Sequence, residues 1–235
     1  MFDFVVSIWQ INKKLPADKK IRIIAADTPR PFNTFLTKDD MINNDAKYDR
    51  DEFMENTILN YIKSNKDNRN SLFVVGTAHI CKSLESAGKK LSEKMPNDSY
   101  AIFVHSPRTD NNKEVSDRIR YGVFDNAFYK SENQPIAFDL KNSPFGKEPF
   151  DGLYNDGFGS YQENYDGYIF LGPLDKEPNG EILLDLYSDK FIIEMDRRLR
   201  LEDTSLNEDW GLKELSKKAV IEKVLESNNT KTRWE

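Results

Sequence analysis

Short apolar runs and longer amphipathic stretches alternate along the first half of this 235-residue chain. The runs at residues 21–27, 71–78 and 100–105 have the length and composition of strands that are buried on both faces. Apolar residues recur at helical spacing before and between them, in residues 4–15, 49–64 and 81–95. This order predicts neighbouring parallel strands joined by right-handed helical crossovers. The expected fold class is α/β, with helices on both faces of a mostly parallel sheet.

The pattern is less regular beyond residue 108. Strands are predicted at residues 135–140 and 168–171, and helices at 111–120, 189–199 and 211–225. Residues 143–163 are rich in Gly, Pro, Tyr and Phe and form too long a segment for a simple connector, so we expect them to be a lid or wall of a site. We expect a single α/β domain over residues 1–200, followed by a C-terminal helix and a polar tail over residues 201–235.

Composition and charge narrow the possible partners. The net charge is −6 and the chain contains no long basic block, so nucleic acid is not an expected partner. The single cysteine, Cys81, excludes an internal disulfide framework and a cysteine-based metal cluster. No apolar run approaches the roughly 20 residues of a membrane span. The first residues lack a signal-peptide pattern, which slightly favours the cytoplasm and leaves the compartment unknown.

Polar residues follow three of the predicted strands. The carboxyl ends of parallel strands meet at one edge of a sheet, where α/β proteins bind ligands. We therefore expect a shared crevice for a small-molecule substrate or ligand, lined from Asp27, Thr28, Arg30, Thr77, His79, His105, Ser106 and Arg108. The imidazole of His79 could accept or donate a proton or hold a metal. The structural alternatives are a histidine that only bonds nearby backbone and an Asp27 that only caps a turn.

Other common catalytic motifs are missing from the sequence. No Gly-x-Ser-x-Gly nucleophile elbow is present, and the glycine-containing segment at residues 157–161 follows no predicted strand, as a phosphate loop would. Two histidines and one cysteine could form a zinc site only together with carboxylates.

Four short motifs occur in an order and spacing that resemble a known superfamily. They are Ile21-Arg22-Ile23-Ile24-Ala25-Ala26-Asp27, Tyr48-Asp49-Arg50-Asp51-Glu52-Phe53-Met54-Glu55-Asn56, Gly76-Thr77-Ala78-His79-Ile80 and Tyr165-Asp166-Gly167-Tyr168-Ile169-Phe170-Leu171. The superfamily joins the erythromycin esterases, the ChaN-like haem-binding proteins and the TraB/TIKI proteins. The resemblance covers roughly residues 5–200, and each motif by itself is short.

The resemblance implies an α/β fold with a deep cleft. In its esterase branch, histidines and glutamates activate a water that opens an ester or lactone. Carried over to this chain, His79 is the base, and Arg50 on the preceding helix stabilises charge. A second acid or base would have to come from Asp27, from His105 or from a partner chain. The expected catalytic residues are therefore His79, Arg50 and Asp27, and the expected substrate-binding residues are Thr77, Arg30, His105 and Arg108.

Two departures from the family pattern limit that expectation. The esterase branch has a further histidine where this chain has Gly76, and the family's Gly-Glu-x-x-His segment is absent. The chain therefore resembles only the C-terminal half of such a protein, without the first strand–helix unit. The exposed apolar stripe of residues 4–11 then predicts self-association, or a partner chain that supplies the missing half, together with weak or no esterase activity by itself.

Two functions of different classes remain open. The first is an erythromycin-esterase-like hydrolase, complete or residual, that needs no cofactor. The second is a non-catalytic binding module of the ChaN-like type that holds haem or a small metabolite, with a divalent metal as a further possibility.

Overall fold

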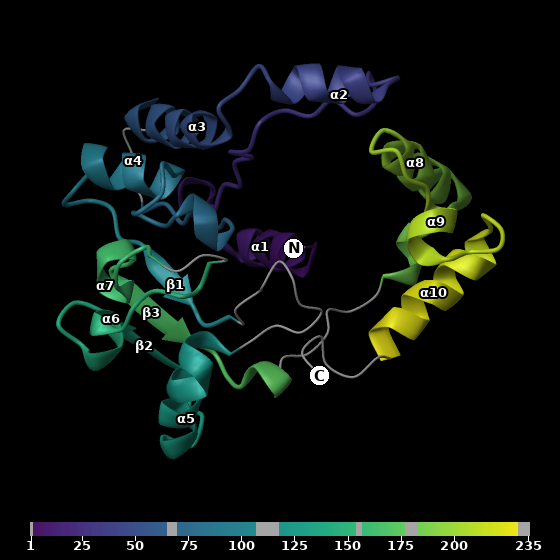
Figure 1. Cartoon of the computed structure of the whole chain (residues 1–235). Helices are drawn as coiled ribbons and strands as arrows, with labels where there is room; N and C mark the ends of the chain where they lie inside the picture. Colours follow the sequence, from purple (N-terminus) through teal and green to yellow (C-terminus); the bar gives the residue numbers. More distant parts are fainter. Residues whose placement is uncertain (1, 65–69, 107–117, 154–156, 177–182, 230–235) are drawn as a thin grey trace.

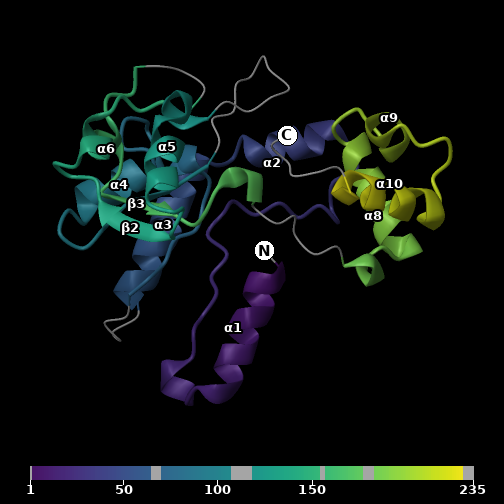
Figure 2. The ribbon, with the colours of Figure 1, turned by 90° about the horizontal axis from the view of Figure 1, so that it is seen from below.

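The structure is a computed structural model that describes residues 2–64, 70–106, 118–153, 157–176 and 183–229. Two groups of elements lie side by side (Figure 1). One contains a small sheet with helices α3 to α7, and the other contains helices α8 to α10. Seen from below, helix α1 reaches away from both groups (Figure 2).

Helices dominate the described residues. The α-helices are α1 (Phe2–Lys14), α2 (Lys38–Asp45), α3 (Arg50–Ser64), α4 (Ala87–Lys94), α5 (Val123–Lys130), α6 (Pro144–Lys147), α7 (Tyr161–Asn164), α8 (Asp189–Arg200), α9 (Leu206–Trp210) and α10 (Lys217–Asn229). Short 3-10 helices are η1 (Ala17–Lys19), η2 (Thr77–His79), η3 (Ile119–Gly122), η4 (Leu174–Lys176) and η5 (Leu184–Leu186). The helices predicted at residues 49–64 and 189–199 are confirmed as α3 and α8, while most of the one predicted at 111–120 lies outside the described residues.

The described sheet has three strands in the order β1-β3-β2. They are β1 (Ile102–Val104), β2 (Ile136–Asp139) and β3 (Gly167–Phe170), which confirm the strands predicted around residues 100–105, 135–140 and 168–171. β1 pairs with β3 in parallel, whereas β2 pairs with β3 antiparallel. The fold is therefore mixed α/β, and the expectation of a mostly parallel sheet is wrong.

The two other predicted parallel strands do not pair. Residues 21–26 and 70–76 have neither helix nor strand assignment, and residues 77–79 turn into the short helix η2. The backbone N–H and C=O of Ile21 bond the side chain of Asn12 in α1 instead of a neighbouring strand. Apolar side chains that a second sheet layer would cover are exposed, as at Leu72 (79%) and Val74 (70%). A run of apolar residues forms a strand only where a partner accepts its hydrogen bonds.

One face of the sheet packs on an unusually aromatic core. Its buried members are Cys81, Phe103, Ile119, Phe124, Phe128, Leu140, Phe150, Tyr161, Tyr165, Tyr168 and Phe170. The rings meet mostly edge-to-face or tilted, and Phe128 stacks on Phe170 with 4.0 Å between ring centroids. Such pairs are worth about 0.5–1.5 kcal/mol each beyond the area they bury.

The segment over residues 143–163, predicted to be a lid or wall, packs into the core in its described part. Its described part contains α6 and the start of α7, and it places Phe150 (1% exposed) and Tyr161 (0%) in the aromatic core. The aromatic residues that distinguish this segment in the sequence are needed for packing, so the segment cannot act as a mobile cover without opening the core.

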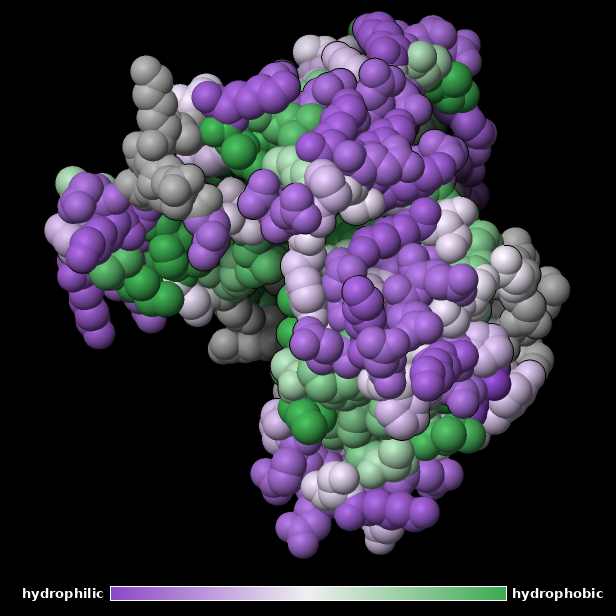
Figure 3. Space-filling model, turned by 90° about the vertical axis from the view of Figure 1, so that its left-hand side faces the viewer, coloured by the Kyte–Doolittle hydropathy of each residue, from purple (hydrophilic) through white to green (hydrophobic). Residues whose placement is uncertain are grey.

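Helices α8, α9 and α10 pack around a second, smaller core of Ile192, Leu206 and Val220. This unit is tied to the segment before α2, because the guanidinium of Arg197 donates to the backbone carbonyls of Phe32 and Phe35. Green apolar patches lie among purple hydrophilic residues on the face of the molecule in Figure 3. Among the described residues, no helix is both long and apolar enough to cross a membrane.

Candidate functional site: a histidine–aspartate pair between two helix starts

The imidazole of His79 lies in the turn of η2, which follows the unpaired segment 70–76. Gly76 is the residue that begins this turn, and the hydroxyl of the buried Tyr165 donates to the carbonyl of Thr77. This hydrogen bond links the turn to the aromatic core, of which Tyr165 is a member. The side chain of His79 is 22% exposed, so solvent reaches part of the ring.

Asp51, in the first turn of α3, holds one nitrogen of that ring. His79 Nδ1 lies 3.0 Å from Asp51 Oδ1 and 3.1 Å from Oδ2. An ionised carboxylate can only accept, so this contact places the ring proton on Nδ1. Nε2 then presents its lone pair, and no hydrogen-bond partner for Nε2 is recorded among the residues that the structure describes.

The start of α4 completes the arrangement. The backbone N–H of Ala87 donates to Asp51 Oδ1 over 2.7 Å, and Ser86 caps the helix by accepting from Lys89. A carboxylate at a helix N-terminus is favoured by the unpaired N–H groups and the helix dipole. The helix approaches the turn so closely that a Cβ at Gly88 would lie 2.4 Å from the carbonyl oxygen of Ile80. Glycine at this position is therefore needed for the contact.

Arg50 and Asp27, two of the expected catalytic residues, form a pair beside Asp51. Arg50 Nε lies 2.7 Å from Asp27 Oδ1, and Nη2 lies 2.5 Å from Oδ2. The hydrogen bonds from Arg50 lower the pKa of Asp27 from 3.8 to about 2. The hydrogen bond to Asp27 likewise raises the pKa of Arg50, and the negative charge of Asp51 adds to that rise. The aspartate that contacts His79 therefore also acts on the charge of Arg50.

The other sequence-predicted residues are placed differently. Arg30 forms a two-bond ion pair with Asp45 of α2, at 3.0 and 2.7 Å. Thr77 belongs to the same turn as His79 and uses its carbonyl to accept from Tyr165. Arg108 lies outside the described residues. The structure therefore places His79 and Thr77 in one turn and pairs Arg50 with Asp27, and Asp51, the neighbour of Arg50 in the chain, contacts His79. The charge of Arg30 also lowers the pKa of Asp27.

His105 lies in the core, with its side chain 1% exposed. Its Nδ1 is 2.6 Å from the hydroxyl of Tyr168, and its Nε2 is 3.5 Å from Asp125 Oδ1. Burial raises the pKa of Tyr168, so its hydroxyl keeps a proton to donate to Nδ1. The ring proton of His105 then lies on Nε2, facing Asp125. In this structure the ring of His105 is not available to a substrate in solution.

Asp125, in the first turn of α5, is the charged group that faces His105. Burial raises the pKa of its carboxyl, but His105 and Arg118 outweigh that effect, and the net result is a lowered pKa. His105 Nε2 and Asp125 Oδ2 are both buried without a hydrogen-bond partner, which leaves this second histidine–aspartate pair imperfectly satisfied.

Sequence reasoning missed both aspartates. Asp51 stands inside the Arg50-containing motif, but the sequence analysis gave it no role of its own. Its position next to Arg50, in the helix that precedes the predicted strand of His79, was the available signal. No signal in the sequence linked Asp125 to His105, since the pairing arises only when α5 packs on the sheet.

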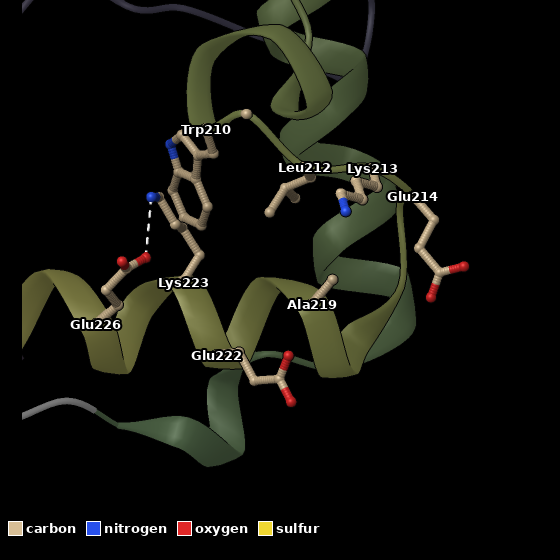
Figure 4. Close-up of a pocket in the computed structure, with 9 residues that line it drawn as sticks. Trp210, Leu212, Lys213, Glu214, Ala219, Glu222, Lys223 and Glu226 are labelled. Atoms are coloured by element: carbon tan, nitrogen blue, oxygen red, sulfur yellow. Dashed lines mark hydrogen bonds and ion pairs between the residues drawn. The ribbon is translucent and has the colours of Figure 1, made fainter.

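Other features offer less chemistry. No group of three or more His, Cys, Asp or Glu side chains that could hold a metal occurs in the described ranges. A shallow groove of about 430 Å³ lies between α9 and α10, lined by residues from Trp210 to Glu226 (Figure 4). An ion pair between Lys223 and Glu226 lies beside Trp210 in this groove. None of the sequence-predicted site residues that the structure describes lines this groove.

Comparisons of the chain with family models, with curated proteins and with solved structures found no match. The family resemblance described above therefore rests on the sequence motifs alone.

Proposed function

We propose that this chain is an erythromycin-esterase-like hydrolase, or a residual form of one, in which His79 activates water for attack on an ester or lactone. The observation that carries the proposal is the contact of His79 Nδ1 with both oxygens of Asp51. A general base needs a lone pair directed to the water and a partner that fixes the ring and stabilises the imidazolium formed on proton transfer. Asp51 can fix the ring and stabilise the imidazolium through Nδ1, and it leaves the lone pair of Nε2 available to the water.

Arg50 is the candidate for stabilising the oxyanion that develops on the carbonyl oxygen. Its contacts with Asp27 use the Nε proton and one Nη2 proton. A guanidinium has five N–H donors, so three are left to bind an oxyanion. In this account Asp27 is a positioning residue that fixes the guanidinium, and Asp51 positions the imidazole.

One observation also favours the second candidate, a binding module that holds haem or a metabolite. A histidine whose Nδ1–H donates to a carboxylate is a more basic ligand through Nε2, as in many metal and haem sites. His79 could therefore be an axial ligand to haem iron. The described residues offer no cluster that would hold a bare metal ion.

Parallel assays on the same variants separate the two functions. The wild-type chain, His79→Ala and Asp51→Asn are compared in a screen of aryl esters and lactones and in a haem titration followed by Soret absorption. Glu52→Gln is the matched control, because Glu52 is an exposed neighbour on α3. The hydrolase proposal expects His79→Ala to lower turnover by about 10²–10⁴-fold, and Asp51→Asn to lower it by a similar order.

Both variants should retain the wild-type unfolding midpoint, since His79 and Asp51 are partly exposed. Haem binding that depends on His79, without ester turnover, would support the binding module instead. Neither turnover nor ligand binding across the screen, or turnover that survives His79→Ala, would contradict the proposed role of His79.

A further inference from the structure

Helix α1 and the segment that follows it form a projecting element, which we call the arm and define as residues 4–24. The side chain of Asn12 bonds both the N–H and the C=O of Ile21, at 2.8 and 2.9 Å, and so holds the returning chain against the helix. Figure 2 shows α1 and η1 directed away from the remaining helices and the sheet. Arg22, near the base of the arm, reaches Tyr61 of α3.

The arm exposes large apolar side chains along its length. Phe4, Ile8, Ile11 and Leu15 have the spacing of one helical stripe, and Val5 and Trp9 flank it. Ile8 is buried (8% exposed), whereas Trp9 is 57% exposed. The other exposed members, at 42–54%, are Phe4, Val5, Ile11, Ile21, Ile23 and Ile24. Large apolar patches on a surface mark sites of interaction with a protein or a membrane.

The charge of the arm is opposite to that of the whole chain. Residues 4–24 contain five basic side chains and one acidic side chain, a net charge of +4, whereas the whole chain carries −6. Its lysines are Lys13, Lys14, Lys19 and Lys20, all of them exposed. The ammonium of Lys13 lies 3.4 Å from the centre of the Trp9 ring. Basic residues therefore border the apolar stripe.

We propose that the arm docks on an anionic lipid bilayer surface. A helix with Trp, Phe and Ile on one face and lysines beside it lies in the headgroup region, with its apolar face at the acyl boundary and its ammonium groups at lipid phosphates. The projection of the arm matters, because the rest of the chain is acidic and is repelled by the same surface. A bilayer also receives scattered apolar side chains on two segments without requiring a shaped pocket. This proposal is independent of the hydrolase activity.

Cosedimentation with phosphatidylcholine vesicles, with and without phosphatidylserine, tests the proposal on the full chain. Binding should require phosphatidylserine and should weaken as salt is added. Trp9→Asp should abolish it, and Lys13→Glu/Lys14→Glu should weaken it by about tenfold or more, given the usual contribution of each basic residue. In a Trp210→Phe/Trp234→Phe background, the emission of Trp9 should shift to the blue on binding.

Matched variants elsewhere serve as controls. Ile193→Asp on α8 removes another exposed apolar residue (64%), and Lys217→Glu/Lys218→Glu reverses two exposed lysines of α10. Both should bind vesicles like the wild type. Absence of binding to either vesicle, or binding unchanged by the arm variants, would overturn the proposal. So would a dimer in light scattering without lipid that Trp9→Asp dissociates, because the occupant would then be a second copy of the chain.

Discussion

The two histidines of this chain have similar sequence contexts and opposite environments. Each lies at the carboxyl end of a predicted strand, and each faces an aspartate from the first turn of a helix. His79 lies between the starts of α3 and α4, with 22% of its side chain exposed, and contacts Asp51 through Nδ1. His105 lies among aromatic rings with 1% exposed and faces Asp125 through Nε2.

The difference shows what makes an imidazole available for chemistry. At His79 the carboxylate of Asp51 contacts Nδ1, so Nε2 carries the lone pair. At His105 the hydroxyl of Tyr168 occupies Nδ1, Nε2 is buried 3.5 Å from the carboxylate of Asp125, and Phe128 and Phe170 pack against the ring. A histidine–aspartate pair is therefore a candidate site in one place and part of the core in the other.

The largest effect on stability is expected at the buried pair. His105→Ala should destabilise the fold by about 2–4 kcal/mol, because it leaves a cavity and removes the charge partner that faces Asp125. His79→Ala should change the free energy of unfolding by less than about 1 kcal/mol, as is usual for partly exposed polar sites. Urea denaturation of both variants measures the difference. Equal losses would erase the distinction between the two regions.

A smaller effect is expected from Tyr168→Phe. The variant keeps the ring in the aromatic core and removes the hydroxyl that lies 2.6 Å from His105 Nδ1. The cost should be about 1–2 kcal/mol, the usual penalty for leaving a buried polar atom unpaired. Tyr165→Phe is the matched control near His79, since it removes the hydrogen bond to the carbonyl of Thr77. The account expects Tyr165→Phe to displace the His79 turn and Tyr168→Phe to leave that turn in place, as backbone amide shifts would report.

Acid should produce the smallest effect, at the Asp27–Arg50 pair. The pKa of Asp27 is lowered to about 2 in the folded chain, below its ordinary value of 3.8. The pair therefore stabilises the fold above pH 4, and this contribution is lost as the pH falls from 4 towards 2. Both side chains are half exposed, so the amount is at most about 1 kcal/mol. Asp27→Asn should remove this part of the acid dependence, and an unchanged profile would show that the pair contributes nothing.

The sequence predicted those parts of the fold whose pattern is local. Phe53, Ile58 and Ile62 repeat at helical spacing in α3, and the apolar run at 168–171 forms β3, which is buried between two strands. Strand pairing is not local. Residues 21–27 and 71–78 have strand-like composition, but nothing in a single sequence states whether a partner accepts their backbone hydrogen bonds. The length and composition of segment 143–163 likewise predict a lid or wall, whereas Phe150 and Tyr161 within it pack in the aromatic core.

The candidate site was predicted in the same partial way. Position at a strand end was sufficient to single out His79 and Asp27, and the helix motif singled out Arg50. The partner of the histidine could not be chosen, because Asp49, Asp51 and Glu52 all lie at or just before the start of α3. Only the packing of α4 against α3, with its close approach at Gly88, selects Asp51.

The most direct measurement is a long-range ¹H–¹⁵N correlation spectrum of the imidazole rings. The chain has two histidines, so the spectrum contains two ring systems, and His79→Ala assigns both. In their neutral forms, the account predicts that His79 carries its proton on Nδ1 and that His105 carries its proton on Nε2. It also predicts that Asp51→Asn alters the His79 ring signals while those of His105 stay unchanged. A proton on Nε2 of His79 would contradict the central claim, because the lone pair would then face Asp51 and could not activate water.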